Sequence, residues 1–193
     1  MREEGRLDRR LKSAQLKCPA SVEDVDFRAR RGLDKDTFLD LAELSFMDRA
    51  GNVIFTGATG LGKTYLAGRA RRRGRSALDR RVTKLLFELS LTRADGTYLK
   101  ALEKLAKADL LILDDWDLAA VKGQAANDLM DVIDDRARTR STIVGSQLPV
   151  SEWHHLVSDP SIADALLDRL VHRSVRAELK GGSMRKETPP DSR

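Results

Sequence analysis

The chain has 193 residues, of which 41% are hydrophobic, and that share is enough to form the core of one α/β domain with some additions. No apolar run approaches the roughly 20 residues that a membrane-spanning helix needs, and the charged N-terminus is unlike a secretion signal, so we expect a cytoplasmic protein without a membrane partner. The net charge of +5 favours an anionic partner such as nucleic acid, while the single cysteine, Cys18, excludes an internal disulfide and a multi-cysteine metal site.

The first fifty residues are predicted to be a helical adjunct to a larger domain. Residues 38–47 carry apolar side chains at helical spacing and predict one amphipathic helix. We therefore divide the chain into an adjunct over residues 1–50, a main domain over residues 51–186 and a disordered tail over residues 187–193, which contains Pro189-Pro190.

A glycine-rich loop between a strand and a helix is the strongest chemical signal in the sequence. Gly57-Ala58-Thr59-Gly60-Leu61-Gly62-Lys63-Thr64 fits the pattern Gly, four residues, Gly-Lys-Ser/Thr. Backbone N–H groups at such a helix N-terminus bind phosphate, and the glycines allow the close approach. Lys63 would reach the β- and γ-phosphates and Thr64 would ligate Mg²⁺, so we predict a nucleotide site rather than an ordinary glycine-rich turn.

The segment after this loop is rich in arginine and poor in apolar residues. The helix is expected to end near Gly74, and Ser76–Arg81 then offers only Ala77 and Leu78 to the next strand. The sequence thus predicts a parallel sheet in which one edge strand is missing or weakened. Two readings of the basic side chains stay open, a nucleic-acid contact and a solvated helix face; these side chains are Arg69, Arg71, Arg72, Arg73, Arg75, Arg80, Arg81 and Lys84.

A second buried strand ends in two acids, since Leu110–Leu113 is followed by Asp114 and Asp115. In a parallel sheet these carboxylates lie at the carboxyl edge, where α/β folds bind ligands. We predict that Asp114 holds Mg²⁺, directly or through water, and that Asp115 positions and activates the water that attacks the γ-phosphate. Without the glycine-rich loop, a helix-capping aspartate would be the simpler reading. Together the two motifs predict a P-loop NTPase, a three-layer α/β sandwich with a central parallel sheet.

The remaining elements extend this pattern. Helical spacing is present over residues 82–89, 99–106, 129–133 and 163–171, and short strands are expected at Ser141–Gln147 and Val175–Leu179. The first of these strands ends in small polar residues, where a side chain could sense the γ-phosphate. His154 and His155 would point about 100° apart on a helix, so we interpret them as surface or packing residues rather than as a metal pair.

Five blocks of residues, taken in chain order, resemble the IstB-like ATPases. That family consists of insertion-sequence transposition helpers of the AAA+ class, related to DnaC-type helicase loaders. The blocks are Gly57 to Thr64, Leu110 to Trp116, Ser146 to Pro149, Asp168 to Leu170 and Gly181 to Lys186. The stretch Ala94–Tyr98 and the N-terminal segment are also similar, so the resemblance runs from about Arg2 to Lys186.

The resemblance implies a AAA+ core over residues 51–186, with a five-stranded parallel sheet and a reduced or absent C-terminal lid. It implies ATP and Mg²⁺ as ligands, weak or partner-stimulated ATP hydrolysis, assembly into homo-oligomers on double-stranded DNA and contact with a transposase. By position, Arg169 matches the arginine finger that reaches a neighbouring subunit's γ-phosphate, Arg185 matches the second sensor arginine, and Ser146 lies in the first sensor block. Tyr65, next after the loop, is grouped with the nucleotide-binding residues.

The sequence also departs from the family pattern. Family members usually begin with a further helical segment, so the resemblance leads us to expect that this chain starts after it, and Gly145 stands where a hydroxyl residue is common. Two alternatives to a transposition ATPase follow. One is a DnaC-like helicase loader in DNA replication, and the other is a truncated, catalytically inactive remnant that binds nucleotide or DNA.

Overall fold

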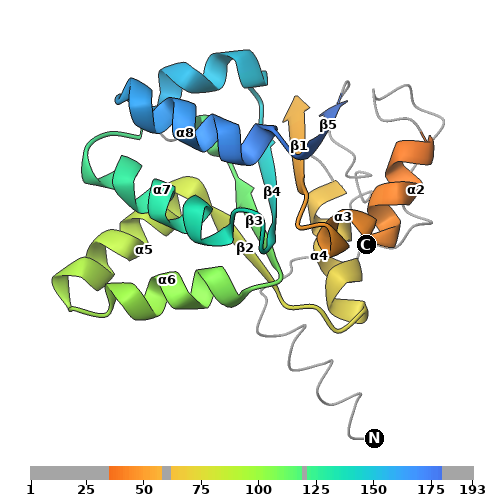
Figure 1. Cartoon of the computed structure of the whole chain (residues 1–193), viewed down its shortest axis with the longest axis horizontal. Helices are drawn as coiled ribbons and strands as arrows, with labels where there is room; N and C mark the ends of the chain where they lie inside the picture. The colour runs from red at the N-terminus through yellow and green to blue at the C-terminus, as the bar shows by residue number, and fades with distance from the viewer. Residues whose placement is uncertain (1–34, 58–61, 119–120, 180–193) are drawn as a thin grey trace, which may run out of the picture.

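A computed structural model of the chain describes residues 35–57, 62–118 and 121–179 (Figure 1). The strands are β1 (Asn52–Gly57), β2 (Ala77–Arg81), β3 (Leu110–Asp114), β4 (Ser141–Ser146) and β5 (Ser174–Leu179). The helices are α2 (Lys35–Glu43), α3 (Ser45–Asp48), α4 (Gly62–Arg72), α5 (Val82–Ala94), α6 (Tyr98–Lys107), α7 (Gln124–Arg136) and α8 (Pro160–Val171), with the 3₁₀ segments η2 (Trp116–Leu118) and η3 (Val150–Leu156). Within these described ranges, no helix has the length and apolar character to span a bilayer.

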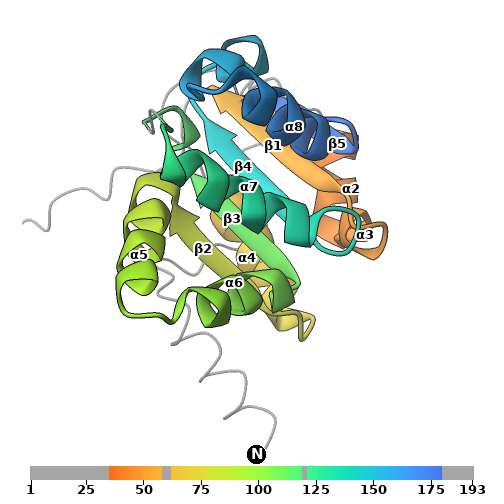
Figure 2. The same ribbon diagram turned by 60° about the vertical axis from the view of Figure 1, so that its left-hand side comes forward.

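The strands form one parallel sheet in the order β2-β3-β4-β1-β5. Parallel neighbours need crossover connections, and here helices supply them on both faces. Helix α4, with α2 and α3, covers one face, whereas α5, α6, α7 and α8 cover the other (Figure 1, Figure 2). The predicted three-layer sandwich with a central parallel sheet is confirmed.

The central strands are apolar on both faces because both faces are covered. In β3, Leu111 and Leu113 pack toward α5 and α7, while Leu110 and Ile112 pack beneath α4, and all four side chains are fully buried. The side chains of β1 alternate in the same way, and Ile54 packs in the same core as Leu111 and Leu113. The continuous apolar run before Asp114 is therefore a strand buried on two sides, and it holds the acids that follow at a fixed position.

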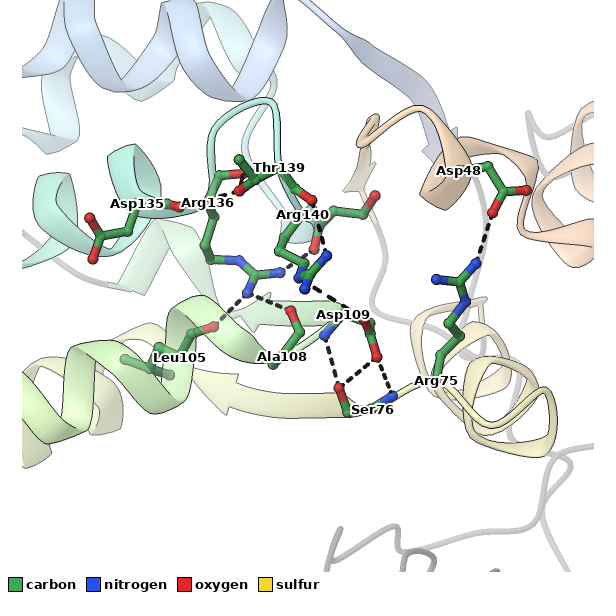
Figure 3. A network of polar contacts seen from close by, with 11 residues as sticks. Asp48, Arg75, Ser76, Leu105, Ala108, Asp109, Asp135, Arg136, Thr139 and Arg140 are labelled. Atoms are coloured by element: carbon green, nitrogen blue, oxygen red, sulfur yellow. Dashed lines mark hydrogen bonds and ion pairs between the residues drawn. The ribbon is translucent and has the colours of Figure 1, made fainter.

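The edge strand that the sequence predicted to be missing or weakened is present as β2, so the alternative in which it is missing is wrong. Strand β2 pairs with β3 over its whole length, from Ala77 opposite Leu110 to Arg81 opposite Asp114. Its start is fixed by the Asp109 carboxylate, which accepts hydrogen bonds from the Ser76 N–H and Oγ, both at 2.8 Å (Figure 3). Main-chain pairing and side-chain hydrogen bonds thus hold β2 in the sheet, without the alternating apolar residues by which a strand is usually predicted from sequence.

Guanidinium groups cover the outer edge of β2. The Ser76 carbonyl accepts from the Leu110 N–H at 3.0 Å, so the alternate carbonyls of Ala77 and Asp79 face away from β3. Arg71 Nη2 donates to the Ala77 oxygen at 2.8 Å, and Arg80 Nη1 donates to the Asp79 oxygen at 2.7 Å. Charged groups on an edge disfavour pairing with another chain, which explains part of the arginine content of this segment.

The amphipathic pattern of residues 38–47 forms two helices rather than the one predicted. Leu44 adopts a left-handed conformation (φ 64°) that ends α2 and begins α3, and both Leu44 and Phe46 are buried in the core beneath α4. The last carbonyls of α2 accept hydrogen bonds from Arg69 Nε of α4, at the Ala42 oxygen, and from Nη1 of Arg73, just after α4, at the Glu43 oxygen. Basic groups commonly satisfy a helix C-terminus in this way.

A buried arginine joins α6, α7 and the start of β4 (Figure 3). Arg136 is 1% exposed and donates to the main-chain oxygens of Leu105, Ala108 and Ser141 and to Thr142 Oγ1. Burial lowers the pKa of Arg136 to about 10, so the guanidinium stays charged at neutral pH. Because charged donors form strong hydrogen bonds, this side chain secures the amino-terminal edge of the sheet.

Candidate nucleotide site

The carboxyl ends of β1, β3 and β4 meet at one edge of the sheet, next to the N-terminus of α4. Gly57 ends β1 with a φ of 91°, a conformation that a side chain disfavours, and α4 begins at Gly62. The predicted loop residues Ala58, Thr59, Gly60 and Leu61 lie outside the described residues. Strand β1 ends and helix α4 begins at this edge of the sheet, and a helix N-terminus suits an anion.

Lys63 and Asp114 are brought together at this edge. Lys63 is 8% exposed, and its Nζ contacts Asp114 Oδ1. The same oxygen accepts a hydrogen bond from the Asp115 N–H at 2.9 Å. Thr64 follows in the first turn of α4. The Lys63 ammonium is nearly buried and the Asp114 carboxylate is partly exposed, so their attraction holds the lysine side chain at this edge of the sheet.

Gly145 of β4 provides the space in which Lys63 lies, and sequence reasoning did not identify it as a site residue. A Cβ at this position would come within 2.8 Å of both Lys63 Cδ and Asp114 Oδ1, closer than real contacts allow. A side chain at position 145 would therefore require Lys63 to move. The sequence signals are a glycine two residues beyond Ile143 on the same face of a buried strand and its departure from the hydroxyl residue that is common in the family.

A further carboxylate, Asp79 of β2, lies near the same pair and was also missed. Burial raises the pKa of Asp79, and the charge of Asp114 raises it further, while Lys63, Arg71 and Arg80 act in the opposite direction. These mutual influences mean that Asp79 belongs to the electrostatic environment of Lys63. The sequence contained a signal, because Asp79 is two residues after Ala77 and therefore lies on the same face of β2.

Asp115 has an unusual backbone and a basic neighbour. Its φ of 55° is uncommon for a residue with a side chain, although aspartate tolerates this region better than most. The carboxylate is 21% exposed, and Arg81 Nε at the end of β2 lies 3.3 Å from its Oδ2. The acid predicted to activate water is thus directed by a strained main chain and held by an ion pair that no motif indicated.

The other predicted nucleotide-binding residues are distributed as follows. Ser146 ends β4 opposite Thr56 of β1, at the same sheet edge, and its Oγ accepts from the Leu148 N–H at 3.1 Å. The Tyr65 side chain is buried in the core beneath α4, which leaves its main chain for any phosphate contact. Arg185 lies outside the described residues.

Arg169 is not brought to this site. It lies near the end of α8, its Nε pairs with Asp134 Oδ1 on α7, and its main-chain oxygen accepts from Asn52 Nδ2 at 3.0 Å. Asn52 is the first residue of β1 and Gly57 the last, so five residue steps, or about 17 Å of strand, separate Arg169 from the phosphate loop. Within one chain, Arg169 therefore lies near the opposite end of β1 from the start of the loop, with its guanidinium paired to Asp134.

The arginine-rich segment is not a single basic face. Arg69, Arg73 and Arg75 bind α2 and α3, the last through Asp48 at 2.9 Å. Arg71 is buried against β2, and Arg81 pairs with the candidate site. Much of the basic charge that favoured a nucleic-acid contact in the sequence therefore has a structural role inside the chain.

The residues present fit a magnesium ion bound together with a nucleotide. Mg²⁺ prefers oxygen ligands and usually takes one or two carboxylates, the remaining positions being filled by phosphate oxygens and water. Asp114 offers a partly exposed carboxylate at the correct edge of the sheet. Within the described ranges, no group of three or more His, Cys, Asp or Glu residues could hold a metal ion.

The fold and this site geometry define the class as a P-loop α/β protein of the AAA+ type. Solved structures with this fold include DnaI, with a TM-score of 0.67 and 22% identity, covering 86% of this chain and 96% of that one. The DnaC helicase loader has a TM-score of 0.60 and 17% identity, with 89% and 99% covered. The replication initiator DnaA bound to AMPPCP and single-stranded DNA has a TM-score of 0.67 and 15% identity, with 86% and 51% covered.

The sequence matches the family described as IstB-like ATP binding protein over residues 1–192. A protein of Sinorhizobium fredii, named as an insertion sequence ATP-binding protein, is 44% identical over 185 residues, which is 94% of this chain and 76% of that protein. A protein of Pseudomonas fluorescens named for insertion sequence IS1162 is 46% identical over 155 residues, covering 78% and 67%. The chain therefore belongs to the IstB-like ATP-binding protein family.

Proposed function

We propose that this chain binds ATP with Mg²⁺ at the carboxyl edge of its sheet and hydrolyses it as a DNA-associated helper of insertion-sequence transposition. The observation that carries this proposal is the contact between Lys63 and Asp114 beneath the N-terminus of α4, with Asp115 next in the chain. This contact supports a site in which Lys63 would bind phosphate, Asp114 would bind the metal and Asp115 would act on water.

Each residue has a distinct part in the proposed reaction. Lys63 would leave Asp114 to bind the β- and γ-phosphates, and Asp114 and Thr64 would hold the metal. When bound, Mg²⁺ would neutralise charge on the phosphates. Asp115 would orient a water for in-line attack and accept its proton, and Ser146 and Arg185 would contact the γ-phosphate side of the nucleotide.

Completion of this site by a second copy of the chain is part of the proposal. Arg169 lies at the amino-terminal edge of the sheet, and its only described acidic partner is Asp134, whose side chain is 56% exposed. The weak surface pair can be exchanged for a phosphate of a neighbouring subunit, where a guanidinium would stabilise transition-state charge. Turnover would then depend on assembly of homo-oligomers on double-stranded DNA.

The proposed partners, DNA and a transposase, are supported by family membership. The relatives that the chain matches are named for insertion sequences, the genetic setting in which a transposase acts. The helicase-loader alternative rests on fold likeness alone, because DnaI and DnaC are only 22% and 17% identical to this chain. Capture of partners on the tagged protein would separate the two, since a replicative helicase as the main partner would overturn the transposition role.

Hydrolysis itself is tested by steady-state ATP turnover with and without duplex DNA. The wild-type chain should release phosphate faster with DNA, and Asp115→Asn should slow release by about a hundredfold while ATP still binds. No release by the wild-type chain under either condition would overturn the ATPase proposal and favour the inactive remnant.

A further inference from the structure

The loops that follow β3 and β4 are joined by a pair of tryptophans. Trp116, directly after Asp115, and Trp153 of η3 are the two tryptophans of the chain, and both are buried. Their ring centroids lie 5.2 Å apart with an interplanar angle of 34°, within the range of a favourable aromatic pair. Trp153 Nε1 also donates to the Leu148 oxygen at 3.1 Å, so this ring is bound to the loop after β4.

Two further attachments join the same loops. Asp117 Oδ1 accepts a hydrogen bond from the Gln147 N–H at 2.9 Å. A parallel bridge pairs Val121 with Val157, beyond the two loops. The ring contact and the hydrogen bonds of Trp153 and Asp117 form a clamp, which we define as Trp116, Asp117 and Trp153 together with the groups that they bind. The bridge between Val121 and Val157 joins the same two segments outside this clamp.

The clamp lies directly beside Asp115 and Ser146, the two residues that need precise placement in the proposed reaction. Asp115 precedes Trp116 and has a φ of 55°, a conformation that persists only when its surroundings impose it. Its side chain has the partner Arg81, but that arginine is 70% exposed and gives a weak constraint. Ser146 precedes Gln147, and its Oγ accepts from the Leu148 N–H. Both residues therefore depend on the clamp for their orientation.

We propose that Trp116, Asp117 and Trp153 are positioning residues, which hold Asp115 in its strained conformation and fix it relative to Ser146. The inference rests on the proposed function for the task of Asp115, the orientation of the attacking water. Because a displacement of about 1 Å at a reacting group can cost a hundredfold in rate, loosening the clamp should slow hydrolysis while nucleotide binding is kept.

The two tryptophans contribute differently, which supplies a matched control. Trp116 Nε1 is buried and has no hydrogen-bond partner in the part of the chain that the structure describes, so only its ring takes part in the clamp. Trp116→Phe and Trp153→Phe both replace a buried indole by a smaller phenyl ring and lose part of the ring contact. Only Trp153→Phe also loses the hydrogen bond to the Leu148 oxygen, so hydrolysis should be slower in Trp153→Phe than in Trp116→Phe.

The sharpest test compares Asp117→Ala with Asp117→Asn, because asparagine retains the oxygen that accepts from Gln147. In Asp117→Ala, kcat should fall about tenfold or more, with the Kd for an ATP analogue within about twofold of the wild type. Asp117→Asn should stay within about twofold of the wild type in both quantities. Amide hydrogen exchange at Gln147 and Leu148 should be faster in Asp117→Ala and unchanged in Asp117→Asn.

Two results would overturn the inference. One is an Asp117→Ala protein with unchanged kcat and unchanged exchange, and the other is an equal loss of kcat and nucleotide affinity, which would indicate general damage to the pocket. If the wild-type chain did not hydrolyse ATP, the proposed function would fail, but the exchange comparison would still decide whether the clamp joins the two loops.

Discussion

At the scale of single residues, Asp115 is subject to opposing influences. In the proposed reaction its carboxylate must be free to accept a proton from water, yet Arg81 Nε lies 3.3 Å from its Oδ2. The guanidinium competes with water for the same oxygen. Because the Arg81 side chain is 70% exposed, solvent screens this pair, which then contributes about 0–1 kcal/mol and can be broken without unfolding the protein.

We therefore expect Arg81→Ala to raise basal ATP hydrolysis. Releasing a pair of about 0.5–1 kcal/mol corresponds to an increase of about two- to fivefold, with a change in the free energy of unfolding below about 0.5 kcal/mol. Lys84→Ala is the matched control, because Lys84 is 66% exposed and its Nζ lies 3.9 Å from Glu88 instead. Slower hydrolysis in Arg81→Ala than in Lys84→Ala would contradict this view of the pair.

The residues found by motif and those found only by structure differ in kind. The sequence identified Lys63, Asp114 and Asp115 because their chemistry requires those residue types at those spacings. Gly145 and Asp79 were not predicted as site residues, since their importance comes from neighbours that are distant in sequence. Gly145 lies against Lys63 of α4, and Asp79 is influenced by Asp114 on the adjacent strand. Such relationships depend on strand order, which no local pattern specifies.

At the scale of elements, β2 depends on polar anchors. Burial tends to raise the pKa of Asp109, but the hydrogen bonds from Ser76 and the charges of Arg140 and Arg75 prevail, and the pKa is lowered. A carboxylate with a depressed folded pKa adds stability above its unfolded pKa, near 4, and that stability is lost as the pH falls through the folded value.

Asp109→Ala should accordingly reduce the free energy of unfolding by about 1–2 kcal/mol at pH 7, and the difference from the wild type should shrink below about pH 4. Urea denaturation at several pH values measures this change. Asp48→Ala, which removes a carboxylate that is 69% exposed and paired with Arg75, should change stability by less than about 0.5 kcal/mol. A loss for Asp109→Ala that is independent of pH would exclude the electrostatic origin.

Arg136 should be the most sensitive polar position between α6 and α7. Arg136→Met leaves the buried oxygens of Leu105, Ala108 and Ser141 without their donor, which should cost about 3 kcal/mol or more. Thermal unfolding would reveal this as a large drop in Tm. Arg140→Met, four residues later and 44% exposed, is the control and should have little effect. Equal Tm values for the two variants would disprove the structural role.

The elements themselves could be predicted to different degrees. The apolar runs of β1 and β3 and the amphipathic stripes of α6 and α8 were identifiable because burial selects their pattern. Strand β2 was not, because an edge strand held by Asp109 and capped by guanidiniums needs few apolar residues. The break at Leu44 was also missed, because a left-handed leucine carries no local signal.

At the scale of the whole molecule, the distance of Arg169 from the phosphate loop predicts that active sites form between subunits. Mixing an Arg169→Ala protein with an Asp115→Asn protein should restore part of the turnover, because some interfaces would combine an intact Asp115 with an intact Arg169. The measurement is ATP hydrolysis across mixing ratios. If the two proteins co-assemble and no ratio restores turnover, the shared site is wrong.

Equilibrium titration with an ATP analogue and Mg²⁺ tests whether Lys63 and its surroundings form a nucleotide phosphate site. Lys63→Ala should weaken binding by about a hundredfold or more, since a charge-assisted contact to phosphate is lost, while Lys122→Ala, at an exposed lysine, should leave the Kd unchanged. Equal affinity of the Lys63→Ala and wild-type proteins would show that Lys63 does not bind the nucleotide phosphates.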